Sequence, residues 1–128
     1  MYSISEISNL TGISAFTLRY YEKIGVLPNP NRKNGIREYS EQDLEFILFI
    51  NGLKKTGMKL EDIAKFSEDG CLKSQTEETI ISDTLSKRID ILTEHLESLE
   101  QQLSDILAVK KVAEDKKAFY SSMLHNKR

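Results

Sequence analysis

The side chains of this sequence that are best suited to a chemical task are arginines and tyrosines near the N-terminus. Residues 17–28, TLRYYEKIGVLP, carry an arginine followed by two adjacent phenols on one short stretch. Guanidinium, ammonium and phenol groups all donate hydrogen bonds to phosphate oxygens, as proteins that hold a nucleic-acid backbone do. The same residue types recur further along the chain, so we predict a phosphate-binding surface made by Arg19, Tyr20, Arg37, Tyr39 and Lys54.

Other residues with reactive side chains are few. The single cysteine, Cys71, excludes an intrachain disulfide and any zinc or iron–sulfur site built from several cysteines. We expect His95 to be a solvated helix residue and His125 to lie in a frayed tail, so we predict no metal site and no cofactor. The sequence shows no nucleophile–base pair, phosphate loop or metal-spaced carboxylate cluster, and it therefore predicts a protein that is not an enzyme.

The charged residues are unevenly distributed, although the formal net charge is only −2. Residues 14–39 carry five basic and two acidic side chains, residues 68–105 carry three basic and ten acidic, and residues 106–128 carry six basic and two acidic. The overall charge argues weakly against a nucleic-acid partner, but the N-terminal basic patch has the sign that such a partner requires.

Length and composition indicate about one globular domain, because the 128 residues are 39% hydrophobic and 30% charged. The longest apolar run, Phe46–Ile50, is far too short to span a bilayer, and residues 1–10 lack the features of a signal peptide. We therefore expect a cytoplasmic protein with no membrane partner.

Two short helices must position the first arginine. Apolar residues recur at helical spacing over residues 4–13, with Ser5 as the expected N-cap, and Ser14 can cap a second helix that turns Leu18 and Tyr21 inward. Two short helices joined by a tight turn that contains glycine make a helix-turn-helix. In such a motif the first residues of the second helix read base edges in the major groove. Here these residues are Ala15, Phe16 and Thr17.

A hairpin and two more helices follow. Asn34-Gly35 is a strong signal for a two-residue turn, with residues 36–39 as the returning strand. Ser40 followed by Asp43 predicts the cap of a third helix that stops at a glycine, and a short fourth helix comes next.

From residue 84 the apolar pattern narrows to a seam with heptad spacing, which predicts a coiled coil. One helix cannot bury this seam alone, so the expected partner is a second copy of the chain. An antiparallel pair sets the acidic half of the helix against basic residues 110–117, whereas a parallel pair sets it against itself, and we predict the antiparallel pair. The seam residues are Leu85, Ile89, Leu92, Leu96, Leu99, Leu103 and Ile106.

The chain resembles the MerR family of bacterial transcription regulators. The matching segments are YSISEISNLTGISAFTLRYYEKIGVLPN, GIREYSEQDLEFI and LKKTGMKLEDIAKF, and the long helix after them matches the family architecture. The resemblance implies a mainly α fold, in which a winged helix-turn-helix DNA-binding domain is followed by a long antiparallel coiled-coil dimerisation helix. The expected boundaries are a DNA-binding domain at residues 1–67, a linker at 68–83, a coiled coil at 84–118 and a C-terminal tail at 119–128.

The resemblance also implies a function. Members bind double-stranded promoter DNA as homodimers, and they bend and untwist an overlong spacer so that RNA polymerase engages both promoter elements. By position, the family's DNA-backbone contacts fall on the five residues of the predicted phosphate-binding surface. Lys59 departs from the pattern, because many members have a Ser or Thr cap there. The resemblance suggests an activator, although the residues themselves leave repression open.

The signal that such a regulator would sense is not apparent. The chain has neither the paired cysteines of the metal sensors nor the four-cysteine cluster of the redox sensors, and we expect no large drug-binding domain after the long helix. The short aldehyde- and electrophile-responsive members look most similar, but their reactive cysteine lies where this chain has Gly52. Cys71 is either a passive thiol in a loop, which we expect because Glu68 and Asp69 disfavour its thiolate, or a thiol sensor.

Two other interpretations stay open at this point. The chain could be a protein-interaction module whose coiled coil is the working surface, or an architectural DNA-bending protein that responds to no signal. Loss of DNA binding on changing Arg19 to Ala would exclude the first of these, whereas only a search for a ligand-dependent response addresses the second.

Overall fold

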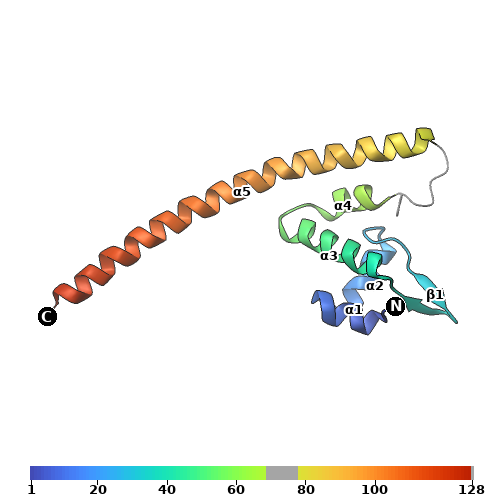
Figure 1. Ribbon diagram of the computed structural model, residues 1–128, viewed down its shortest axis with the longest axis horizontal. Helices are drawn as coiled ribbons and strands as arrows, with labels where there is room; N and C mark the ends of the chain where they lie inside the picture. Colours follow the sequence, from blue (N-terminus) through green and yellow to red (C-terminus); the bar gives the residue numbers. More distant parts are fainter. Residues whose placement is uncertain (69–77, 128) are drawn as a thin grey trace. The chain divides into compact units, whose positions relative to one another are not determined.

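A computed structural model of the protein describes residues 1–68 and 78–127 (Figure 1). The chain divides into two units, Met1–Ile91 and Leu92–Arg128. The predicted arrangement of short helices, a small wing and a long C-terminal helix is confirmed.

The helix-turn-helix consists of α1 (Ile4–Thr11) and α2 (Ala15–Lys23). The N-cap of α1 is Ser3 and not the predicted Ser5. Ser3 has Glu6 three residues later, so the serine side chain and the glutamate side chain each accept a hydrogen bond from the other residue's backbone N–H, at 3.1 and 3.0 Å. Ser14 caps α2 as predicted, because its hydroxyl accepts from the backbone N–H of Thr17 at 3.1 Å.

The wing is an antiparallel hairpin of β1 (Asn31–Lys33) and β2 (Ile36–Glu38). Asn34 and Gly35 form the turn with φ of 53° and 80°, the left-handed values that a two-residue hairpin turn requires. Beyond the end of β2, Tyr39 exchanges backbone hydrogen bonds of 2.7 and 2.9 Å with Tyr2. The base of the wing is therefore tied to the N-terminus of the chain.

After the wing come α3 (Glu41–Lys55) and α4 (Leu60–Ser67). The predicted capping box of Ser40 and Asp43 starts α3, and Gly57 with φ of 98° follows its end. Lys59 makes no side-chain cap for α4. The missing cap agrees with the departure of Lys59 from the Ser or Thr of many family members.

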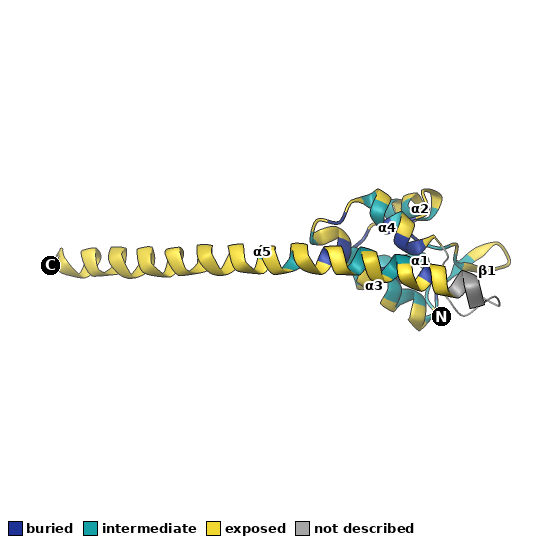
Figure 2. Ribbon diagram, turned by 90° about the horizontal axis from the view of Figure 1, so that it is seen from above, coloured by how far each residue is buried: buried dark blue, intermediate teal, exposed yellow. Residues whose placement is uncertain are grey.

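The core of the first unit lies between the short helices, because α1 packs against α2 and α3, and α3 packs against α4. Each large apolar side chain that is taken fully out of water contributes about 1.5–3 kcal/mol. Figure 2 marks the buried residues in dark blue. The largest fully buried side chains are Ile7, Leu18, Val26, Ile50 and Ile63.

The long helix, α5, runs from Glu78 to Asn126. It therefore begins inside the segment predicted as a linker and continues through most of the segment predicted as a tail. Neither residues 78–83 nor residues 119–126 contain the glycine or proline that would end a helix. Among the helices of the described residues, none is long and apolar enough to cross a membrane.

Candidate nucleic-acid interface

The outer face of α2 presents the first group of predicted contact residues. Phe16 is 78% exposed and Tyr20 is 47% exposed, and Arg19 lies exposed between them in sequence. Leu18 is buried on the opposite side and Tyr21 is half-buried, so the inward and outward faces of α2 are as predicted. The helix thus offers an arginine, a phenol and an exposed aromatic ring on one side.

Ala15 and Thr17, at the start of α2, are only half exposed. The Thr17 hydroxyl accepts a hydrogen bond of 2.9 Å from the Ser14 hydroxyl, so it is part of the helix cap. Of the three residues predicted to read bases, Phe16 is therefore the most exposed.

Arg37 of the wing is held by an acidic residue of α2. Its Nε donates to Oε2 of Glu22 at 2.9 Å and its Nη2 donates to Oε1 at 3.5 Å. Arg32, on the other strand, lies 3.6 Å from the same carboxylate. The hydrogen bond from Arg37 to Glu22 raises the pKa of the guanidinium above its ordinary value, so the cation stays charged.

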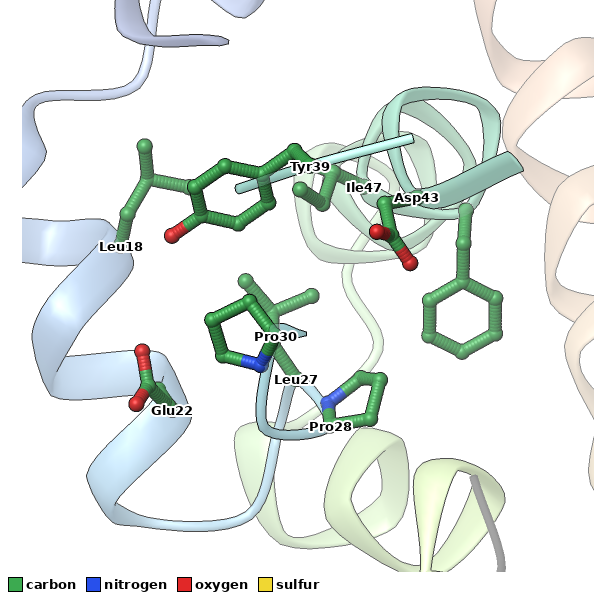
Figure 3. A pocket seen from close by; sticks show the side chains of 9 residues that line it. Leu18, Glu22, Leu27, Pro28, Pro30, Tyr39, Asp43 and Ile47 are labelled. Atoms are coloured by element: carbon green, nitrogen blue, oxygen red, sulfur yellow. The ribbon is translucent and has the colours of Figure 1, made fainter. Parts of the chain in front are cut away.

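The sequence predicts that Tyr39 points outward from its strand. The structure instead buries it, with only 5% of the residue exposed. Arg37 and Tyr39 do share a face, as expected for alternate residues. This face is turned toward α2, because Arg37 pairs with Glu22 and the Tyr39 ring points toward Leu18 (Figure 3). Burial raises the pKa of the Tyr39 phenol, and the Glu22 carboxylate raises it further. Because the Tyr39 ring belongs to the core, only its hydroxyl could contact a phosphate. That contact stays a prediction.

Figure 3 shows a small cavity at this junction, with the Tyr39 ring reaching across it toward Leu18. Its volume is 20 Å³, about enough for one water molecule. Such a cavity is a packing defect between α2, the wing and α3, and it is far smaller than a typical ligand site of roughly 300–1,000 Å³. The residues that line it are Leu18, Glu22, Leu27, Pro28, Pro30, Tyr39, Asp43, Phe46 and Ile47.

Lys54 lies apart from the other predicted contacts. It is exposed in the last turn of α3, whereas the wing joins the first turn of that helix. Thirteen residues at about 1.5 Å each separate Lys54 from Glu41, so the lysine is roughly 20 Å along the helix from the wing. The structure therefore brings Arg19, Arg37 and Tyr39 together around α2 and offers Lys54 as a separate cation.

The pairing of Glu22 with Arg32 and Arg37 was not predicted from the sequence. A signal was present, because the turn at Asn34-Gly35 fixes the register that places Arg32 directly opposite Arg37. Two cations facing each other across a hairpin need a counter-charge. Glu22 is the acidic residue of α2, but its approach to the wing depends on the tertiary fold.

The predicted seam of α5 is exposed along much of its length in the single chain (Figure 2). Leu92 and Leu99 are half-buried, and Leu85, Ile89, Leu96, Leu103 and Ile106 are between 43% and 62% exposed. Large apolar side chains, among them Phe119, Tyr120, Met123 and Leu124, are also exposed beyond the point where the predicted seam ended.

The remaining candidates can be placed only in part. Cys71 lies outside the described residues. His95 is buried and not solvated as the sequence analysis expected, and His125 belongs to the last turn of α5 and not to a frayed tail. Among the described residues, no group of three or more His, Cys, Asp and Glu side chains is arranged to hold a metal ion.

Comparison with known proteins places this geometry in a family. Residues 2–69 match the family described as "MerR HTH family regulatory protein". The chain is 46% identical to the uncharacterized HTH-type transcriptional regulator YyaN of Bacillus subtilis, with 97% of this chain and 94% of the relative covered. It is 30% identical to the HTH-type transcriptional regulator AdhR of the same organism, with 69% of this chain and 66% of the relative covered.

A solved structure is similar over nearly the whole chain. It is the crystal structure of HiNmlR, a MerR family regulator lacking the sensor domain, bound to promoter DNA. The TM-score is 0.78 and the sequence identity is 33%, with 94% of this chain and 90% of that chain covered. These relatives are transcriptional regulators and not enzymes.

Proposed function

Because the chain belongs to the MerR family of helix-turn-helix regulators, which bind DNA to regulate transcription, we propose that it binds promoter DNA as a homodimer and distorts that DNA to control transcription initiation. The observation that carries the proposal is the exposed face of α2, where Phe16, Arg19 and Tyr20 stand beside a basic wing. The similar HiNmlR structure is bound to promoter DNA, which supports this use of the fold.

The residues of the first unit have distinct roles in the proposed complex. Ala15, Phe16 and Thr17 face base edges at the start of α2, with Phe16 giving apolar contact such as a thymine methyl offers. Charged and hydroxyl groups bind phosphates and fix the register of the protein on the duplex. These groups are Arg19, Tyr20, Arg37, the Tyr39 hydroxyl and Lys54.

The homodimer forms through the apolar seam of α5, in antiparallel orientation. The exposed seam residues would otherwise leave a stripe of apolar surface in water, and covering it with a second copy removes that unfavourable contact. Charge supports the direction, because Lys110, Lys111, Lys116 and Lys117 then face the acidic N-terminal half of the partner helix. Residues 1–67 remain the DNA-binding part and residues 84–118 the paired part.

Distortion follows from two-fold symmetry. Two recognition helices on one face of a duplex read half-sites separated by whole turns of roughly 34–36 Å. If the DNA must bend so that both recognition helices reach their half-sites, the bend costs on the order of 1–6 kcal/mol. Phosphate contacts on both protomers offset this cost. By the family resemblance, the distortion lets RNA polymerase engage an overlong promoter, and we place the protein in the cytoplasm, where that DNA lies.

The proposal is tested by the salt dependence of duplex binding. Wild type and Arg19→Ala are titrated against a fluorescent random-sequence duplex at several salt concentrations. We expect the wild type to bind with a steep salt dependence, and Arg19→Ala to reduce the slope by about 0.9 for the phosphate contact it loses. Lys59→Ala, which removes an exposed cation outside α2 and the wing, should leave the slope unchanged. Equal slopes for wild type and Arg19→Ala would contradict the phosphate contact of Arg19, and failure of the wild type to bind the duplex would favour a protein-interaction module.

A further inference from the structure

Glu22 is the only acidic residue of α2, and it meets both strands of the wing. Its carboxylate accepts from Arg37 of β2 at 2.9 and 3.5 Å and lies 3.6 Å from Arg32 of β1. The Glu22 side chain is 11% exposed, so the carboxylate is largely removed from water. One mostly buried anion is therefore shared by two cations.

The register of the hairpin explains why that anion is needed. Arg32 lies directly opposite Arg37, so both side chains emerge on the same face of the wing. Like charges in this position repel each other, and a two-stranded hairpin has little stability of its own. The Glu22 carboxylate lies between the two cations and offsets their repulsion.

The geometry of the pair also orients Arg37. Nε and Nη2 face the carboxylate, which leaves Nη1 outside the pair. A guanidinium is planar and rigid, so fixing two nitrogens fixes the direction of the third. Arg32 is braced in a second way, because its Nη1 donates to the backbone oxygen of Gly35 at 3.0 Å in the turn.

We propose that Glu22 is a positioning residue for DNA recognition: it holds Arg32 and Arg37 beside the recognition helix and aims the remaining N–H groups of Arg37 at a phosphate. This inference rests on the proposed function. Although the negative charge of Glu22 repels the duplex, Glu22 thereby favours binding to the selected sequence.

The test compares two probes, namely a duplex that the wild-type protein selects from random DNA and a random-sequence duplex of equal length. With Glu22→Gln we expect binding to the selected duplex to weaken about tenfold, the size of one charge-assisted hydrogen bond. Binding to the random duplex should stay equal or strengthen, since a negative charge is removed.

Two other outcomes overturn the inference. If both probes bind more tightly by the same factor, Glu22 acts only as a repelling charge. If both bind more weakly by the same factor, it only supports the fold. Should Glu22→Gln not fold, Glu22→Asp keeps the charge but shortens the side chain, and it should show the same selective loss to a smaller degree.

Controls separate this inference from the function it rests on. Glu38→Gln removes the same charge from the wing, at the position opposite Asn31, and should not reduce the preference for the selected duplex. In an Arg37→Gln background, Glu22→Gln should cause no further selective loss, and additive losses would contradict the role through Arg37. If the wild type shows no preference between the two probes, the proposed function itself fails.

Discussion

Arg19 and Arg37 carry the same charge in different surroundings. Arg19 is exposed on α2, whereas the Arg37 side chain is 22% exposed and paired with Glu22. An exposed cation adds attraction for any duplex, but a cation in a fixed geometry adds attraction only where a phosphate meets it. The two arginines should therefore contribute to affinity and to selectivity in different proportions.

The capping glutamate of α1 predicts a dependence of stability on pH. Hydrogen bonds from Ser3 lower the pKa of the Glu6 carboxyl below its ordinary value of 4.5. Since the pKa of the folded state is lower than that of the unfolded state, this stabilisation is present above the unfolded pKa and is lost as pH falls through the folded pKa.

We therefore expect Glu6→Gln to lower the thermal midpoint at neutral pH, with a difference from wild type that declines as the pH falls below the ordinary pKa and disappears below the lowered pKa of the folded state. Thermal melts followed by circular dichroism from pH 7 to acid measure this. Glu45→Gln, an exposed change inside α3, is the matched control. A Glu6→Gln difference that stays constant with pH would show that the charge is not what stabilises the cap.

The core side chain of Ile50 predicts a larger effect on stability. Ile50 is 1% exposed in α3, and Leu48 on the same helix is 45% exposed. Ile50→Ala should reduce the free energy of unfolding by about 2–5 kcal/mol, because it removes buried methyl groups and leaves a cavity. Leu48→Ala should cost much less. Urea denaturation of both variants at one protein concentration measures the difference, and equal losses would contradict the placement of α3.

At the scale of elements, the sequence predicted what local chemistry decides. The caps at Ser14 and Ser40, and the turn at Asn34-Gly35, depend on residues within four positions of each other, and the structure confirms them. Ser5 was the wrong cap for α1, because the partner Glu6 favours Ser3.

Features that depend on tertiary contacts were not predictable in the same way. Alternation along the strand gives Arg37 and Tyr39 a common face, but it does not say which way the hairpin leans. The inward turn of that face follows from the pairing with Glu22 and the burial of Tyr39. The extent of α5 was underestimated, because the seam weakens at Lys110 while the helical composition continues.

The turn of the wing predicts an effect on recognition without loss of fold. Gly35 has φ of 80°, and a Cβ there would meet open space, so the penalty of Gly35→Ala is backbone strain of about 1–2 kcal/mol. We expect faster amide exchange in the wing, weaker binding to the selected duplex and unchanged helix content. Gly52→Ala, at a helical glycine whose Cβ also meets open space, is the control. Undiminished binding by Gly35→Ala would mean that the wing takes no part in recognition.

At the scale of the whole molecule, the long helix sets the reach of the proposed dimer. α5 contains 49 residues, which at about 1.5 Å per residue gives a length near 74 Å. Such a helix is long enough to keep two DNA-binding units a full helical turn of DNA apart. The relative direction of the two α5 helices decides where the two DNA-binding units lie.

Cysteine cross-linking distinguishes the two directions. In a Cys71→Ser background, single cysteines replace the seam residues Ile89, Leu99 or Ile106, which are spread along α5. A parallel pair places every seam residue beside its own copy, within reach of a disulfide, so all three variants would form disulfide-linked dimers. In the antiparallel pair we expect at most one position, the one nearest the two-fold axis, to do so. Oxidation followed by non-reducing electrophoresis gives the answer, and efficient linkage at all three would exclude the antiparallel dimer.

The most direct test of sequence-specific DNA binding through α2 is selection of bound sequences from random duplex DNA, with wild type and Arg19→Ala in parallel. We expect the wild type to enrich a pseudo-palindrome, as a two-fold dimer requires, and the variant, which binds every duplex more weakly, to enrich it less strongly. The recovered motif would also identify candidate target promoters. Absence of any enriched sequence with the wild type, or the same motif at the same strength with Arg19→Ala, would contradict recognition by this face of α2.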